Sequence, residues 1–168
     1  MLEIADIKTL QAPLKARYRD EPEAALILLH AEGSLGAGVT CSVETGSAVV
    51  RAGLHPATGG GLENVCSGDM LLQSLVACAG VTMNAVANAL ALPIRDAKVR
   101  AEGELDVRGT LGVDRTAPVG FRHIRLAFEI EGDLSAEQRD TLVRLTERYC
   151  VVLQTIRSGP EVTVTVAP

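Results

Sequence analysis

The sequence predicts an α+β fold with mainly antiparallel strand pairing and one long buried helix. Residues 67–92 are small or apolar on nearly every side of a helix, which is typical of a helix inside a protein. Apolar and charged residues alternate over 98–107 and 121–131, which indicates half-buried strands. Ser135 followed by Gln138 forms a capping-box pattern, which predicts the start of a second helix.

The stretch 67–92 predicts the longest helix, around which the rest of the chain is organised. Ser67 is the expected N-cap, Asp69 is an acid that suits the positive end of the helix dipole, and Pro93 stops the helix. At about 1.5 Å per residue it would span roughly 35 Å, about the width of a small domain. Three polar residues interrupt it: Gln73, Asn84 and Asn88. The uninterrupted apolar run is shorter than the ~18 residues of a membrane span, so we expect no membrane partner.

The remaining strands are predicted from short aliphatic runs that lie between turn residues. Three precede the long helix, at 24–32, 39–45 and 47–53, and a closing strand is expected at 161–166. The second helix is expected to run to about Cys150.

Residues 1–23 are polar and mixed, with Pro13 and Pro22 as helix breakers. They form either a short helical arm or a solvated surface segment. No linker, repeat or low-complexity segment divides the chain. Residues 1–168 are therefore expected to form a single domain, with residues 1–23 as an N-terminal arm.

Composition argues against several classes of function. The chain has 168 residues, 47% of them hydrophobic, but no Trp and two each of Tyr and Phe, so its core must be aliphatic. The formal net charge is −5 and no basic patch is visible, so no nucleic acid partner is expected, because phosphate neutralisation needs clustered Lys and Arg. The first residues, MLEIADIKTL, lack a cationic start followed by an apolar core, so we expect a cytoplasmic protein without a signal peptide.

Four cysteines carry the candidate chemistry: Cys41, Cys66, Cys78 and Cys150. In a reducing compartment, with an ample core, free or redox-active thiols are expected rather than two disulfides. Cys78 lies in the middle of the long helix and Cys150 at the end of the second. From spacing alone these two are either packed thiols or a reactive pair. No CxxC or HExxH pattern is present, so neither a metal site nor a cofactor is expected.

Two cysteine motifs resemble the signatures of a known family. GDMLLQSLVACAGVTMNAV, residues 68–86, places Asp69 nine positions before Cys78 and resembles the central-helix signature of the OsmC/Ohr family, the osmotically inducible and organic hydroperoxide resistance proteins. ERYCVVLQTI, which contains Cys150, resembles the second cysteine signature, and PVGFRHIRLAFEIEGDL resembles the strand that leads into the second helix. The motifs occur in the family's order, and the resemblance extends from about Ala24 to the C-terminus, with the broad OsmC-like branch as the best match.

The resemblance implies an OsmC-like α+β fold, in which two mainly antiparallel sheets surround central buried helices. It also implies an intertwined homodimer with active sites at the subunit interface. It implies that Cys78 is the peroxidatic thiolate and Cys150 the resolving thiol, with Asp69 at the position of a family glutamate. The implied activity is reduction of organic hydroperoxides through a Cys78 sulfenic acid and a Cys78–Cys150 disulfide. A dithiol reductant, such as a lipoylated protein, would then restore both thiols.

The sequence departs from the family pattern at several positions. The first hairpin, EGSLGAGV, has no arginine, and Gly68 and Val151 stand where many members have proline. Four other arginines are candidates for the cation beside Cys78: Arg17, Arg19, Arg115 and Arg122. Because a buried cysteine without a nearby cation or donor is inert, the alternative function is a non-catalytic OsmC-like protein that binds a small molecule or senses thiol oxidation.

The helix at 67–92 favours a homodimer independently of the resemblance. A single layer of strands does not cover a helix that is apolar on nearly every side, and burial against a second copy of the chain is the common solution. Cys41 and Cys66 match no catalytic position of the family, so both are expected to be dispensable for chemistry.

Overall fold

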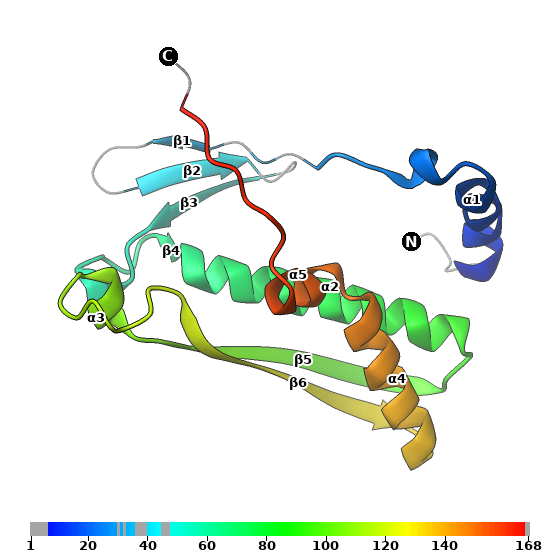
Figure 1. The fold of residues 1–168 in the computed structure, drawn as a ribbon. Helices are drawn as coiled ribbons and strands as arrows, with labels where there is room; N and C mark the ends of the chain where they lie inside the picture. The colour runs from blue at the N-terminus through cyan, green and yellow to red at the C-terminus, as the bar shows by residue number, and fades with distance from the viewer. Residues whose placement is uncertain (1–6, 30, 32, 36–39, 45–47, 167–168) are drawn as a thin grey trace. The chain divides into compact units, whose positions relative to one another are not determined.

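The computed structural model describes residues 7–29, 31, 33–35, 40–44 and 48–166 (Figure 1). Helices and small sheets mix along the chain, so the predicted α+β class is confirmed. The chain forms two compact units: Met1–Gln73 with Ala101–Leu126 is the first unit, and Ser74–Arg100 with Ala127–Pro168 is the second unit. The single domain expected for residues 1–168 stays a prediction.

The first unit contains a four-stranded sheet in the order β1-β2-β3-β4. Its strands are β1 (Gly33–Leu35), β2 (Thr40–Glu44), β3 (Val49–Gly53) and β4 (Val65–Cys66). β1, β2 and β3 pair antiparallel, whereas β4 pairs parallel to β3. The strands predicted at 39–45 and 47–53 are therefore confirmed, and Cys41 lies in β2 as expected.

The first unit also contains several helices. They are α1 (Ile7–Asp20), η1 (Pro22–Ala25), η2 (Pro56–Thr58) and α3 (Val107–Thr110). In the N-terminal arm, Ile7–Asp20 form a helix and residues 12–20 are all exposed, so the arm is both helical and solvated there. Pro13 lies inside α1 although proline removes one N–H donor from a helix. The short helix α3 begins directly after its N-cap residue Asp106.

Two predicted strands are wrong. In 24–32 the chain finishes η1 and then continues through Leu26–Leu29, whose four side chains are 76–81% exposed, without pairing among the described residues. In 161–166 the chain also belongs to no strand, and Val162, Val164 and Val166 are 78–92% exposed. Both runs have the composition of a strand, but a strand also needs a partner edge, and the described part of one chain offers none.

The long helix α2 (Ser67–Ala89) confirms the central prediction and ends earlier than Pro93. Ala91 has φ 52°, and the N–H of Leu92 donates to the Ala87 carbonyl at 2.9 Å while that of Ala91 donates to Asn88 at 3.1 Å. These bonds form a Schellman motif, which ends the helix before the proline is reached. Ser67 is the first helical residue rather than the flanking N-cap.

Among the described helices, α2 alone is long and apolar enough to cross a membrane by length and composition. The core helix of a soluble protein has the same length and composition, so this property alone is weak evidence for a membrane span. Only 22% of its most apolar window is buried within one chain.

The core of the second unit lies between α2, the paired strands and the second predicted helix. Met83, Ala87 and Leu142 are its buried centre, and half-buried hydrophobic residues, Phe128 among them, pack around them. The second helix is α4 (Ala136–Tyr149), and its capping box is formed as predicted: the Gln138 N–H donates to the Ser135 hydroxyl at 3.2 Å and the Ser135 N–H to the Gln138 side chain at 2.8 Å. A further helix that the sequence did not predict, α5 (Val151–Arg157), follows at once.

The two long strands β5 (Ile94–Leu105) and β6 (Phe121–Gly132) pair with each other, which confirms both alternating patterns. Arg100 pairs with Glu129 at 2.7 Å, and Glu104 pairs with Arg125, so residues later in β5 face residues earlier in β6. The strands are therefore antiparallel (Figure 1). The inner face expected for β6 is confirmed, because Ile124, Leu126, Phe128 and Ile130 are the half-buried positions.

A small ionic cluster in the first unit fixes the start of α3. Asp106 is the N-cap of this helix and accepts hydrogen bonds from the Arg108 N–H at 3.2 Å and from its guanidinium at 3.0 and 2.6 Å. Arg108 also binds Asp114 at 3.3 Å. The hydrogen bond from the Arg108 side chain lowers the pKa of Asp106 from 3.8 to about 2, although burial opposes this change.

Acid is expected to release this cluster only near pH 2. Because the pKa of Asp106 is lower in the folded chain than its ordinary 3.8, the ionised carboxylate stabilises the fold above pH 3.8, and this contribution is lost as the pH falls through about 2. Asp106→Asn should therefore lower the thermal midpoint at neutral pH, and the midpoints of the two proteins should converge near pH 2. Calorimetry across this range, with the exposed Asp140→Asn as control, checks it. A difference that is the same at every pH would contradict the prediction.

Candidate thiol active site

Cys150 lies at a one-residue break between α4 and α5. Its backbone is extended (φ −73°, ψ 105°), yet its N–H still donates to the Thr146 carbonyl at 2.9 Å, and its carbonyl accepts from the Gln154 N–H at 3.0 Å. The break starts a new helix, and the first N–H groups of a helix have no partner within it. The N–H groups of Val151 and Val152 are therefore available to another acceptor.

That acceptor is the sulfur of Cys78, which lies half-buried in α2 within the same unit. Burial raises the pKa of Cys78, but hydrogen bonds from the Val152 N–H, the Cys150 thiol, the Thr82 hydroxyl and the Val151 N–H outweigh it, so the pKa is lowered below its ordinary value. The Thr82 hydroxyl has one proton and donates it to the Cys78 carbonyl at 2.7 Å, so the amides and the Cys150 thiol are the stronger donors to the sulfur.

The Cys150 thiol has the opposite electrostatic environment. It is 0% exposed, and its pKa is raised first by burial and then by its hydrogen bond to Cys78 and by the charge of the Cys78 thiolate. The N–H groups of Leu153 and Val152 lower the pKa of Cys150, but they offset only part of the rise. The Cys150 side chain makes no capping hydrogen bond at the start of α5. Cys150 is therefore the harder of the two thiols to deprotonate, and it donates a hydrogen bond to Cys78.

The two thiols form a polarised pair. A thiolate is the nucleophilic form of cysteine, and a protonated thiol beside it is held in place to react later. Both cysteines are free thiols in this structure, as is Cys66. The arrangement can deliver one activated sulfur to an electrophile and then close a disulfide with the second.

The structure brings Cys78 and Cys150 together and leaves the role of Asp69 a prediction. Asp69 lies in the first turn of α2, nine residues before Cys78, in the part of the helix that belongs to the first unit. Its side chain is exposed and makes no hydrogen bond or ion pair with the described residues.

Backbone donors are the functional groups that the sequence reasoning missed. None of the four candidate arginines is among the donors described for Cys78, and Arg17 instead pairs with Glu21 at 3.4 Å. The available signal was the apolar run VVLQTI directly after Cys150, which has the length of a two-turn helix. A helix that starts at the residue after a cysteine places its free N–H groups beside that cysteine.

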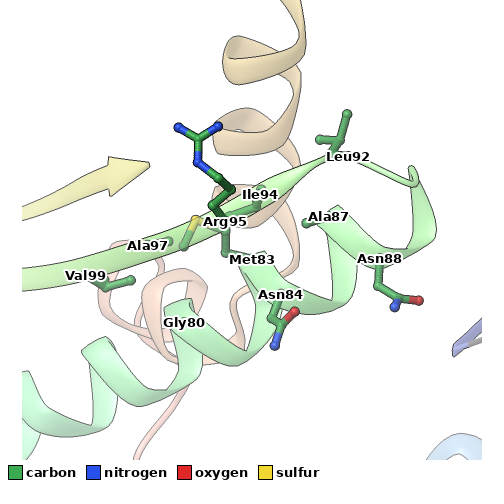
Figure 2. Close-up of a pocket in the computed structure, with 10 residues that line it drawn as sticks. All are labelled: Gly80, Met83, Asn84, Ala87, Asn88, Leu92, Ile94, Arg95, Ala97 and Val99. Atoms are coloured by element: carbon green, nitrogen blue, oxygen red, sulfur yellow. The ribbon is translucent and has the colours of Figure 1, made fainter. Parts of the chain in front are cut away.

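A separate groove lies in the second unit, where α2 runs beside β5 (Figure 2). Its volume is about 390 Å³. Figure 2 shows Met83 pointing from the helix toward the strand, while Asn84 and Asn88 lie at the helix rim and Arg95 at the strand rim. Cys78 does not line this groove, so the groove and the thiol pair are separate features. The described residues contain no group of three His, Cys, Asp or Glu side chains arranged to hold a metal ion.

Comparisons with known proteins agree with the fold and with the family that the sequence resembles. The family model described as OsmC-like protein matches residues 59–165, well over half of the chain. No protein in a search of curated sequences matches the chain.

Several solved structures share the fold at low identity. An OsmC-like protein from Mycoplasma pneumoniae is 18% identical with a TM-score of 0.66, covering 79% of this chain and 89% of its own. A Legionella pneumophila protein described as an organic hydroperoxide resistance protein is 20% identical with a TM-score of 0.63, covering 80% and 93%. The organic hydroperoxide resistance protein OhrB of Bacillus subtilis is 19% identical with a TM-score of 0.54, covering 80% and 94%. At these identities the likeness shows the fold alone.

Proposed function

The chain belongs to the OsmC-like protein family, and from that premise we propose that it is a cysteine-based thiol peroxidase that reduces organic hydroperoxides. The observation that carries the proposal is the polarised thiol pair, in which Cys78 accepts hydrogen bonds and Cys150 donates one. The names of the Legionella and Bacillus proteins of the same fold, both organic hydroperoxide resistance proteins, support the choice of substrate class.

The proposed cycle uses Cys78 first. The Cys78 thiolate attacks the terminal oxygen of the hydroperoxide, an S–O bond forms, the O–O bond breaks, and the alkoxide leaves and takes up a proton to become the alcohol. Cys150 then loses its proton and attacks the Cys78 sulfenic acid, so that an S–S bond forms and the oxygen leaves as water. The peroxide is reduced, and the two thiols are oxidised to one disulfide. A dithiol such as a lipoylated protein returns both to thiols by exchange.

The surroundings of the pair favour an organic substrate over hydrogen peroxide. Leu75 and Ala79 precede and follow Cys78 on the buried stripe of α2, and Leu153 follows Cys150 in α5; all three are buried. An apolar surrounding binds the alkyl part of an organic hydroperoxide, whereas hydrogen peroxide has none to bury.

The experiment that tests the function is a thiol titration of the reduced protein. One equivalent of cumene hydroperoxide should remove two titratable thiols per chain, and peptide mapping should find one disulfide between Cys78 and Cys150. If Cys78 stays reduced in about tenfold excess hydroperoxide, the peroxidase proposal fails. The non-catalytic OsmC-like protein then takes its place, and the groove at Met83 and Arg95 becomes its candidate binding site.

The proposal also includes the setting in which the cycle runs. We place the protein in the cytoplasm, where a dithiol reductant is available and structural disulfides are rare. We propose a homodimer as the working unit, because α2 is mostly exposed within one chain and the family resemblance implies two chains.

Val151 offers a direct test of the backbone donors. Val151→Pro removes one N–H donor to Cys78, and proline is tolerated at the first position of a helix, so α5 should still form. The pKa of Cys78 should rise, and the second-order rate with hydroperoxide at neutral pH should fall about tenfold, the effect of one hydrogen bond to a charged group. Val151→Ala, which keeps the N–H, is the control. Stopped-flow rates from pH 5 to 10 check the prediction, and equal rates for both variants would exclude the donor.

A further inference from the structure

Thr146 is a buried polar side chain that the proposed cycle leaves without a role. It lies on α4, it is 0% exposed, and its hydroxyl oxygen has no hydrogen-bond partner among the described residues. A buried hydroxyl without a partner destabilises the folded state, so such a group calls for an explanation.

Thr82 shows what a threonine in a helix ordinarily does. Its hydroxyl donates to the Cys78 carbonyl one turn earlier, at 2.7 Å. Thr146 lies within a helix like Thr82, in the last turn of α4, but its hydroxyl makes no such bond to the carbonyl of Leu142. The hydroxyl of Thr146 is therefore uncommitted in the reduced protein.

The uncommitted hydroxyl lies one helical turn before the resolving cysteine. Residues four apart on a helix share a face, with Cβ atoms about 5–6 Å apart. The 2.9 Å bond from the Cys150 N–H to the Thr146 carbonyl shows that helical spacing persists to Cys150. Because both side chains are 0% exposed, a hydrogen bond between them acts in a medium of low dielectric, where it is stronger than in water.

We propose that the Thr146 hydroxyl donates a hydrogen bond to the Cys150 sulfur as this sulfur becomes a thiolate in the resolving step. The inference rests on the proposed peroxidase function. In the reduced protein Cys150 is a donor to Cys78 and needs no donor itself. Once Cys78 carries a hydroxyl group, Cys150 loses its proton and attacks the Cys78 sulfur, the S–S bond forms and the S–O bond breaks. The departing hydroxide takes up a proton and leaves as water, and Thr146 is not consumed.

The test compares two substitutions that differ only in the hydroxyl. Thr146→Val keeps the shape of the side chain and removes the donor, whereas Thr146→Ser keeps the donor. After one equivalent of cumene hydroperoxide, the Cys78 sulfenic acid, trapped with dimedone at timed intervals, should persist about tenfold longer in Thr146→Val than in Thr146→Ser or wild type. The rate of sulfenic acid formation should not change. Thr155→Val, at an exposed position of α5, is the control.

Two further readouts separate this role from a structural one. The thermal midpoint of Thr146→Val should equal or exceed that of wild type, because the change removes a buried hydroxyl that has no partner. In the Cys78→Ser background, a small methanethiosulfonate reagent at fixed pH should modify Cys150 more slowly when Thr146 is Val, since the thiolate has lost a donor.

Equal sulfenic acid lifetimes in Thr146→Val and wild type would overturn the inference. A clear fall in the thermal midpoint of Thr146→Val would also overturn it, because the hydroxyl would then have a structural partner. If wild type forms no sulfenic acid, the peroxidase proposal fails, and the reactivity of Cys150 in the Cys78→Ser background still decides whether the hydroxyl donates to this sulfur.

Discussion

Cys78→Ser is expected to abolish hydroperoxide turnover, a loss of at least three orders of magnitude in rate. The sulfur is the atom that attacks the peroxide oxygen, and a serine hydroxyl has no anionic form at neutral pH that could replace the thiolate held by Val152, Cys150 and Val151. The measurement is consumption of cumene hydroperoxide with a dithiol as reductant.

Two controls separate this loss from a general sensitivity to cysteine replacement. Cys41→Ser and Cys66→Ser should each keep the rate within a few-fold, and a loss from either as deep as that from Cys78→Ser would contradict the assignment.

Cys150→Ser is expected to stop the cycle one step later. The Cys78 sulfenic acid needs no second thiol to form, so this variant should consume one equivalent of peroxide and gain the mass of one oxygen. Dimedone should label Cys78, and excess peroxide should oxidise it further. The Cys150 thiol is also a donor to Cys78, so the first oxidation should be somewhat slower than in wild type. A Cys150→Ser protein that still turns over repeatedly would show that Cys150 does not resolve the intermediate.

The elements that the sequence predicted well are those whose signals are local. The alternation of apolar and charged residues in β5 and β6 indicates strands with one buried face and one solvent-exposed face. The capping box at Ser135 depends only on residues within one helical turn. The end of α2 was placed three residues late, because Pro93 was the visible stop signal while a left-handed Ala91 ends the helix first. Alanine is not the residue that usually takes this conformation, so no pattern marked it.

The two missed strands show where local pattern is insufficient. The runs at Leu26–Leu29 and Val162–Val166 carry the residue types of strands, yet strand formation depends on an edge supplied by another part of the fold. The sequence also does not identify which face of α2 is buried. A helix that is apolar on nearly every side has no periodicity from which to choose the buried stripe. In the structure Val81 is 73% exposed, whereas the buried stripe consists of Leu75, Ala79, Met83 and Ala87.

The sequence motifs pointed to two cysteines that lie together in the structure, but not to the groups that set the pKa of each. Cys78 and Cys150 were identified through motifs, and the structure places them within hydrogen-bonding reach of each other. The groups that lower the pKa of Cys78 were sought among arginine side chains, because a sequence shows the identity of side chains and not the position of backbone donors. Backbone N–H groups are present at every residue except proline, so only the position of a helix start decides which of them becomes a donor.

A variant that charges the exposed face of α2 is expected to lose the dimer and much of its thermal stability. Val81 is 73% exposed in one chain, and only 22% of the most apolar window of α2 is buried, although its composition is that of a core helix. A second copy of the chain is the proposed cover, and burying a valine side chain contributes about 1.5–3 kcal/mol on each protomer. Val81→Glu would place an unpaired charge in that interface on both protomers, which is costly.

We expect wild type to sediment as a dimer at micromolar concentration, and Val81→Glu to sediment as a monomer whose thermal midpoint is lower by about 10 °C or more. Ala127→Glu introduces the same charge at an exposed position of β6 and should leave both properties nearly unchanged. The physical reason for coupling the two losses is that a helix of this composition gains its stability from burial, and a separated monomer leaves it in water. Sedimentation equilibrium and circular dichroism on the same samples measure both. A wild-type protein that is monomeric and folded at micromolar concentration would show that α2 does not need a second chain to cover it.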